Sequence, residues 1–280
     1  MAFAITHFLV GASLLLLSAA PFVLRYDLDQ TAVMWIVPIG GIWGLLPDLH
    51  NVSPVFGAEL FAIHNSPWMS LFAFHYLLDT PAVRDRQNVS ILLAIALFVF
   101  ALSIVSLAYW IRDRQTIARM QLGKLAITGV SGAIAAGFAT ITLTAVVSTQ
   151  WEFDTVAGLV GADRVLIGLL VVLIGGFVLG LGYLAAFVLI VPRQYQMMSR
   201  YGAGAGIGIG VVAWLSGVVV FVPLWVQWVV GGELAIPFVH WLSLGGLVLY
   251  GAVFGSLYAI VSGAFAVGSG REMDGGIVGV

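Results

Sequence analysis

Residues 165–191 read VLIGLLVVLIGGFVLGLGYLAAFVLIV, and this stretch decides the fold because it contains no Asp, Glu, Lys or Arg. A helix needs about 20 predominantly apolar residues to span a bilayer. Segments of similar character occur at residues 2–24, 89–111, 125–148, 205–230 and 239–267. Hydrophobic residues make up 61% of the chain and charged residues only 9%, which is more apolar surface than a water-soluble core could bury. We therefore predict an all-α, polytopic membrane helix bundle of about seven transmembrane helices, within a range of about six to eight.

The composition also excludes several classes of protein. The chain contains no cysteine, so disulfides, thiolate metal sites and cysteine nucleophiles are absent. Its formal net charge of -2 provides no basic surface for nucleic acid. Residues 2–24 lack the basic start of a secretory signal and carry Thr6 and His7 instead, so we interpret them as a retained helix. The expected location is the cell membrane, with the lipid bilayer as partner.

Two apolar segments near the N-terminus are too short or too irregular for an ordinary span. Residues 31–47 contain Pro38 and three glycines, and residues 68–78 are too few to cross a bilayer unaided. We predict broken helices in this region. Non-helical backbone at membrane depth is tolerated only where protein or a water-filled cavity covers it. A functional site is therefore expected between residues 25 and 88.

Six ionisable residues in and beside these segments form the candidate site. Ionisable groups within a membrane are costly and usually have a function or a partner. Imidazole and carboxylate ligands together suit a divalent metal such as zinc or manganese. The candidate ligands are His7, Asp48, His50, His64, His75 and Asp79. Each residue also has a purely structural interpretation, such as an interfacial ion pair between His75 and Asp79, which are spaced one helical turn apart.

Helix geometry limits how these residues can combine. On one continuous helix His64 and His75 would lie about 16 Å apart, too far to bind one ion. Asp48 and His50 can converge because they follow Pro47 in a loop. We therefore predict a metal site made of His7, Asp48 and His50, completed by either His64 or the pair of His75 and Asp79.

Four short motifs follow one another along the same region. Thr6-His7 is followed by Leu46-Pro47-Asp48-Leu49-His50, then by His64-Asn65-Ser66, then by His75-Tyr76-Leu77-Leu78-Asp79-Thr80. This order resembles the membrane-bound metal-dependent hydrolase family of bacteria and archaea, which pairs a helix-1 His with Pro-Asp-x-Asp-His, His-Arg-x-x-Thr-His-Ser and His-x-x-x-Asp segments. The match covers residues 1–88. Here His50 replaces the second acidic residue and one His of the double-His segment is missing. The resemblance implies a metal site in either an active or a degenerate, non-catalytic relative.

The second half of the chain contains an internal repeat. A Gly-xxx-Gly-xx-Tyr pattern occurs twice, first at Gly176, Gly180 and Tyr183, then at Gly251, Gly255 and Tyr258. A unit of two spans returns the chain to its starting side, so we predict a tandem parallel repeat of two-helix units within residues 125–267, divided into 125–199 and 200–267. Such glycines allow close approach of helices in lipid. They are expected to pack helices within the chain, or between chains in a homo- or hetero-oligomer.

Three classes of function remain open. The first is a non-enzymatic membrane protein, a degenerate relative of the hydrolases. The second is an active metal-dependent hydrolase of a membrane or lipid-linked substrate, and the third is a small transporter. The near absence of charge in the repeat half argues against transport. Residues 41–85 and the repeat half also resemble archaeal membrane proteins, in agreement with a composition in which Lys124 is the single lysine, but no activity follows from that likeness.

Positive charges in short loops predict the orientation. The N-terminal region 1–88 is followed by a spanning helix that begins at residue 89 and by a loop at residues 112–124. This loop is the most basic one and is expected in the cytoplasm. The C-terminal tail at residues 268–280, expected to be flexible, lies on the same side. The N-terminus is outside if residues 31–47 span. It is inside if those residues are re-entrant or if residues 68–78 also cross.

This orientation predicts the accessibility of two loops. A reporter fused within residues 112–124 should be cytoplasmic, and one fused after Trp151 should be external, because Lys and Arg resist translocation. Protease treatment of intact cells measures both. Cleavage of the 112–124 loop from outside would contradict the orientation.

Overall fold

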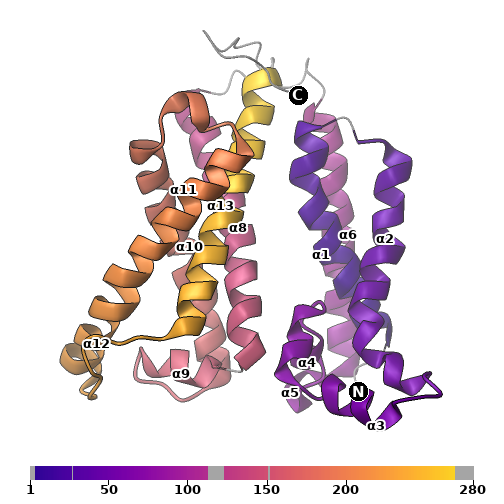
Figure 1. Ribbon diagram of the computed structural model, residues 1–280. Coiled ribbons are helices and arrows are strands. Elements are labelled where there is room, and N and C mark those ends of the chain that lie inside the picture. The colour runs from indigo at the N-terminus through magenta and orange to yellow at the C-terminus, as the bar shows by residue number, and fades with distance from the viewer. Residues whose placement is uncertain (1–3, 27, 113–122, 151, 269–280) are drawn as a thin grey trace. The chain divides into compact units, whose positions relative to one another are not determined.

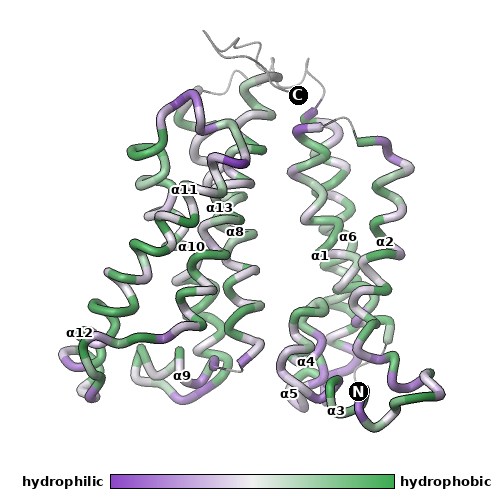
Figure 2. Tube along the Cα trace, in the orientation of Figure 1, coloured by the Kyte–Doolittle hydropathy of each residue, from purple (hydrophilic) through white to green (hydrophobic). Residues whose placement is uncertain are grey.

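The computed structural model describes residues 4–26, 28–112, 123–150 and 152–268. Every regular element within these residues is helical, and seven helical segments are long and apolar enough to cross a membrane. Figure 2 shows hydrophobic residues along the long helices and hydrophilic residues mainly toward their ends. The prediction of an all-α, polytopic helix bundle is confirmed. Most of the basic loop, at residues 113–122, and the tail at residues 269–280 lie outside the described residues.

The helices form two compact units, of which unit 1 contains the N-terminal ones (Figure 1). Three long helices dominate it: α1 (Ala4–Arg25), α2 (Gln30–Leu45) and α6 (Gln87–Arg112), with α1 packed against both of the others. Five short helices connect α2 to α6, namely η1 (Leu46–Asn51), α3 (Gly57–His64), η2 (Pro67–Leu71), α4 (His75–Leu78) and α5 (Pro81–Arg84). These short helices gather at one end of the unit, where α1 begins.

Residues 31–47 do not form the expected broken segment. They form the continuous helix α2, which contains Pro38 and runs directly into η1, so that Gln30–Asn51 is long enough to span. The physical reason is close packing on α1. A Cβ at Gly40 would meet the Gly11 carbonyl oxygen at 2.7 Å, so the two backbones touch where the glycines leave room. Neighbouring helices allow Pro and Gly inside transmembrane helices.

Residues 68–78 do not cross the membrane as one helix. They are divided between η2 and α4, because Ala73 and Phe74 have positive φ values of 54° and 60° and turn the chain between the two. Unit 1 therefore has three spanning helices.

At the end opposite the short helices, the Tyr109 hydroxyl donates to the Leu28 carbonyl at 3.1 Å and the Arg112 guanidinium donates to the Tyr26 carbonyl at 3.2 Å.

Unit 2 contains the remaining four spans. Its helices are α8 (Lys124–Gln150), α9 (Phe153–Gly158), α10 (Val165–Ile190), η3 (Arg193–Tyr195), α11 (Ser199–Ala213), η4 (Trp214–Phe221), α12 (Val222–Trp225), η5 (Val226–Val230) and α13 (Trp241–Gly268). The elements from α11 to η5 form one long helix in which η4 and η5 are wider, π-type turns. The packing of α11 against α13 is the most extensive contact of the unit.

Glycines make that contact possible. Gly202 and Gly206 of α11 face the backbones of Gly255 and Gly251 of α13, and a Cβ on any of the four would meet the opposite carbonyl oxygen. Aromatic side chains fill the space beside the contact, where the Tyr183 ring lies 5.0 Å from the ring of Tyr250.

The first copy of the glycine pattern packs in a similar way. A Cβ at Gly176 would meet Thr140 of α8 at 2.8 Å, and one at Gly180 would meet the side chain of Ala136. In each copy, then, the patterned glycines face the spanning helix that precedes them in the chain, α8 for α10 and α11 for α13. The expected packing role agrees with these contacts, while duplication of a two-helix unit stays a prediction.

Gly180 and Gly182 of α10 provide a matched pair of substitutions. Gly180→Leu should overpack the contact with α8 and lower the free energy of unfolding by about 1 to 3 kcal/mol. Gly182→Leu should have little effect, because a Cβ at Gly182 has no neighbour within 4 Å. Thermal denaturation in detergent measures both variants. Equal loss of stability in the two would mean that Gly180 has no special packing role.

Candidate metal centre

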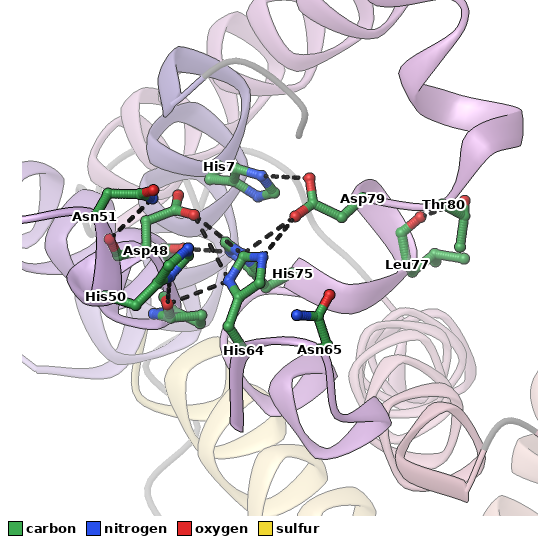
Figure 3. A network of polar contacts seen from close by, with 12 residues as sticks. His7, Asp48, His50, Asn51, His64, Asn65, His75, Leu77, Asp79 and Thr80 are labelled. Atoms are coloured by element: carbon green, nitrogen blue, oxygen red, sulfur yellow. Dashed lines mark hydrogen bonds and ion pairs between the residues drawn. The ribbon is translucent and has the colours of Figure 1, made fainter. Parts of the chain in front are cut away.

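All six candidate ligands lie at the end of unit 1 where the short helices gather (Figure 3). They come from four helices and the residue that follows the last of them. His7 is on α1, Asp48 and His50 are on η1, His64 ends α3, His75 begins α4, and Asp79 directly follows α4. His7, His64 and His75 are buried, and the carboxylates of Asp48 and Asp79 keep 18% and 14% of their side-chain surface exposed. The structure therefore brings together residues that lie far apart in the sequence.

Close crossing of α1 and α2 positions the first part of the site. A Cβ at Gly44 would collide with the carbonyl oxygen of His7, so glycine is required for this approach. Gly11, one turn further along α1, lies against the same glycine. Because α2 continues into η1 just after Gly44, the crossing places His7 beside Asp48.

The expectation that His64 and His75 are too distant to share an ion is wrong. Their ring centroids lie 5.0 Å apart. The distance estimate assumed one continuous helix, but α3 ends at His64 and the chain turns twice before His75. At the first turn Ser66 accepts a hydrogen bond from the Trp68 N–H at 3.3 Å and so caps η2, which begins with Pro67. The second turn contains Ala73 and Phe74 with positive φ.

Asp79 is the most connected carboxylate of the cluster. Its Oδ1 lies 3.4 Å from His7 Nε2, and its Oδ2 lies 3.2 Å from His64 Nε2 and 3.7 Å from His75 Nε2. Asp48 Oδ1 lies 3.5 Å from His75 Nε2. Figure 3 shows these contacts converging between the histidine rings. Both alternatives predicted from the sequence, His64 and the pair of His75 and Asp79, are therefore present together.

Backbone carbonyls fix the orientation of three imidazoles. Nδ1 of His75 lies 3.1 Å from the Gly44 carbonyl oxygen, and Nδ1 of both His50 and His64 lies 3.2 Å from the Pro47 carbonyl oxygen. A carbonyl oxygen can only accept, so each Nδ1 carries a proton and donates it. In the neutral imidazole Nε2 is then unprotonated. Sequence patterns do not reveal such carbonyl partners, although the glycine at position 44 indicates close backbone approach.

Burial also favours neutral His64. Desolvation holds the pKa of His64 below its ordinary value of 6.5, and the neighbouring His75 and His50 lower it further, against the opposing influence of Asp79 and of the Pro47 carbonyl. At neutral pH His64 therefore directs an Nε2 lone pair at a carboxylate oxygen of Asp79 only 3.2 Å away. Two acceptors at this distance repel each other unless a proton or a metal ion lies between them.

The donor atoms fit a divalent metal ion. Bond lengths of about 2.0 to 2.2 Å in a tetrahedral zinc site place neighbouring ligand atoms about 3.3 to 3.6 Å apart. The nitrogen-to-oxygen distances of 3.2 to 3.7 Å agree with that spacing. Three overlapping groups of ligand atoms are close enough to hold an ion: His7, Asp48 and His75; Asp48, His50 and His64; and His64, His75 and Asp79.

Buried polar atoms without hydrogen bonds support the same fit. Both ring nitrogens of His7, and Nε2 of His75, are buried and form no hydrogen bond among the described residues. Leaving such atoms unsatisfied costs about 1 to 3 kcal/mol each. His50 is peripheral by comparison, with its ring 4.4 Å from that of His64 and 5.4 Å from that of Phe61. The inner donors are therefore His7, Asp48, His64, His75 and Asp79.

Searches against protein-family models, curated proteins and solved structures gave no match. The functional argument therefore depends on the geometry of this site and on the motifs that compose it.

The close crossing of α1 and α2 at Gly44 predicts which substitution would expose the histidines of the site. Gly44→Ala should push α1 away from α2 and expose His7 and His75, whereas Ile42→Ala, at a side chain that is 58% exposed on the same helix, should not. Diethyl pyrocarbonate modification of histidines, read by mass spectrometry, measures the exposure. Undiminished protection of His7 and His75 in Gly44→Ala would contradict this role of the crossing.

Proposed function

We propose that the protein binds one divalent cation, zinc or manganese, in the cluster at the end of unit 1. The observation that carries the proposal is the arrangement of three buried imidazoles, His7, His64 and His75, whose Nε2 atoms face the oxygens of two carboxylates. Mixed nitrogen and oxygen donors suit both metals. The hydrogen bonds from Nδ1 of His64 and His75 to carbonyls are the outer partners usual for metal-binding histidines.

Charge balance favours a metal ion over protons. A divalent ion neutralises the two carboxylates of Asp48 and Asp79 while all three imidazoles stay neutral. Without it, two imidazoles would have to be charged in a buried site, where His64 has a lowered pKa. A buried charge without a compensating partner is expensive. One ion is expected, because each of the three groups shares a residue with each of the others: Asp48, His64 or His75.

Hydrolysis is the second candidate function, and the exposure of the donors favours it. The histidines are buried while Asp48 and Asp79 are partly exposed, so the site opens on its carboxylate side. A divalent ion in such a site would lower the pKa of a bound water. Asp79 contacts three histidines and would hold the ion together with them. The motif resemblance supports a metal-dependent hydrolase of a membrane substrate, while His50 in place of an acidic residue favours a non-enzymatic relative.

Orientation of the site follows from the three spans of unit 1. Arg25 and Arg112 lie at the end opposite the cluster, next to the basic loop that the charge rule places in the cytoplasm. The N-terminus and the metal centre are then on the external face. Arg84 and Arg86 lie on the cluster side and oppose this orientation, but they are fewer than the positive charges of the loop at residues 112–124.

Metal binding is tested with purified protein in detergent. Wild type should retain about one zinc or manganese ion per chain, and His75→Gln or Asp79→Asn should weaken binding by at least about 10- to 100-fold, the loss seen even for outer partners of metal ligands. Occupancy should fall as the solution becomes acidic, because protons compete with the metal for the imidazole nitrogens.

His240→Gln is the matched control for that experiment. His240 lies in unit 2, where its Nε2 is 3.4 Å from Glu152, and has no part in the cluster. Its replacement should leave metal content unchanged. The proposal fails if wild type binds no ion after incubation with zinc or manganese, or if His75→Gln and His240→Gln retain the same amount.

A further inference from the structure

A set of exposed apolar side chains, here called the rim, lies on and between η1, α3 and η2, the short helices beside the metal centre. It consists of Val52, Val55, Phe56, Phe61 and Trp68. The side chains of Val52 and Phe56 are 77% and 71% exposed, and those of Phe61 and Trp68 are 53% and 52% exposed. In Figure 2 the chain around α3 contains hydrophobic residues although it lies beyond the long helices of unit 1. All five residues fall between the ligands Asp48 and His75 in the sequence.

The rim lies near the boundary of the membrane because the chain connects it directly to a candidate span on either side. The segment Gln30–Asn51 is a candidate span that ends one residue before Val52, and the next span starts at Gln87. The intervening helices are anchored by the site itself, since His64 is the buried residue of α3 and His75 that of α4. The rim therefore cannot lie far from the surface of the bilayer.

Charged and apolar residues are divided along this segment. Phe61 and Glu59 are both exposed on α3, but two positions apart on a helix they point in nearly opposite directions. The exposed run of Arg84, Asp85 and Arg86 just before α6 also marks a face in contact with water. Ile63, one turn after Glu59 on α3, shares the Glu59 face and is not part of the rim. The side with Phe61 is thus suited to lipid and the side with Glu59 to water, as in a helix that lies in the membrane interface.

We propose that the rim inserts into the headgroup region of the lipid bilayer. Trp and Phe are favoured at that depth. The exposed polar residues Asn51 and Asn65 interrupt the rim, which suits a hydrated lipid interface better than the dry centre of a contact with a second copy of the chain. Insertion itself does not require a metal. If the proposed metal binding holds, insertion also places the ion at headgroup depth. The molecule that the metal centre binds would then be an amphiphile from the same leaflet.

Site-directed spin labelling tests the insertion, because a chain without cysteine accepts a single label at any chosen position. Phe56→Cys and Trp68→Cys are labelled in the full-length protein, reconstituted into nanodiscs of phosphatidylcholine and phosphatidylglycerol. Glu59→Cys and Asp85→Cys are the matched controls on the polar side. Relaxation by oxygen, which concentrates in lipid, is compared with relaxation by a water-soluble nickel chelate.

Insertion predicts an oxygen-to-nickel ratio several-fold higher at positions 56 and 68 than at positions 59 and 85. Equal ratios at all four positions would overturn the proposal and make the rim an aqueous surface. Protection of positions 56 and 68 from both reagents would also overturn it, in favour of contact with a second copy of the chain. Because the measurement is made without metal, failure of the metal centre would leave the ratios unchanged, and the two proposals can fail separately.

Discussion

The close crossing of α1 and α2 is the contact on which the rest of unit 1 depends. In lipid there is little hydrophobic drive between helices, so association relies on packing and on hydrogen bonds between them. Gly11 and Gly44 allow the two backbones to touch, and the same contact places the carbonyl of Gly44 where His75 can donate to it. One crossing thus stabilises the helix pair and orients a candidate metal ligand.

The cost of burying polar groups explains why the cluster is organised so tightly. Imidazoles and carboxylates at the edge of a membrane must find partners, and here three of the five inner donors are histidines shielded from water. The Pro47 and Gly44 carbonyls satisfy one nitrogen on each of His64 and His75. The opposite nitrogens are left facing oxygen atoms of Asp48 and Asp79. A cation is the simplest species that satisfies all of these groups at once.

Unit 2 uses the same packing device, and its described residues contain no comparable group of candidate metal ligands. Glycines bring α11 against α13 and α10 against α8, as in unit 1, but the tyrosines beside them donate to backbone carbonyls of neighbouring helices. The Tyr250 hydroxyl donates to the Gly176 carbonyl at 2.7 Å, and the Tyr183 hydroxyl donates to the Leu247 carbonyl at 3.3 Å. These described contacts stabilise the packing of the helices in unit 2.

The sequence by itself determined the membrane class, a range of six to eight spans and the six candidate residues of the cluster, because apolar length and ionisable residues in a membrane are local signals. It did not determine that residues 31–47 are one helix, since the packing of α1 on α2 outweighs the local preferences of proline and glycine. Nor could it place His64 beside His75. That proximity depends on turns at Ser66 and at Phe74, and the left-handed backbone of Phe74 has no signal in its residue type. Only the tertiary structure decided which imidazole nitrogens face the carboxylates, because backbone carbonyls from another helix select them.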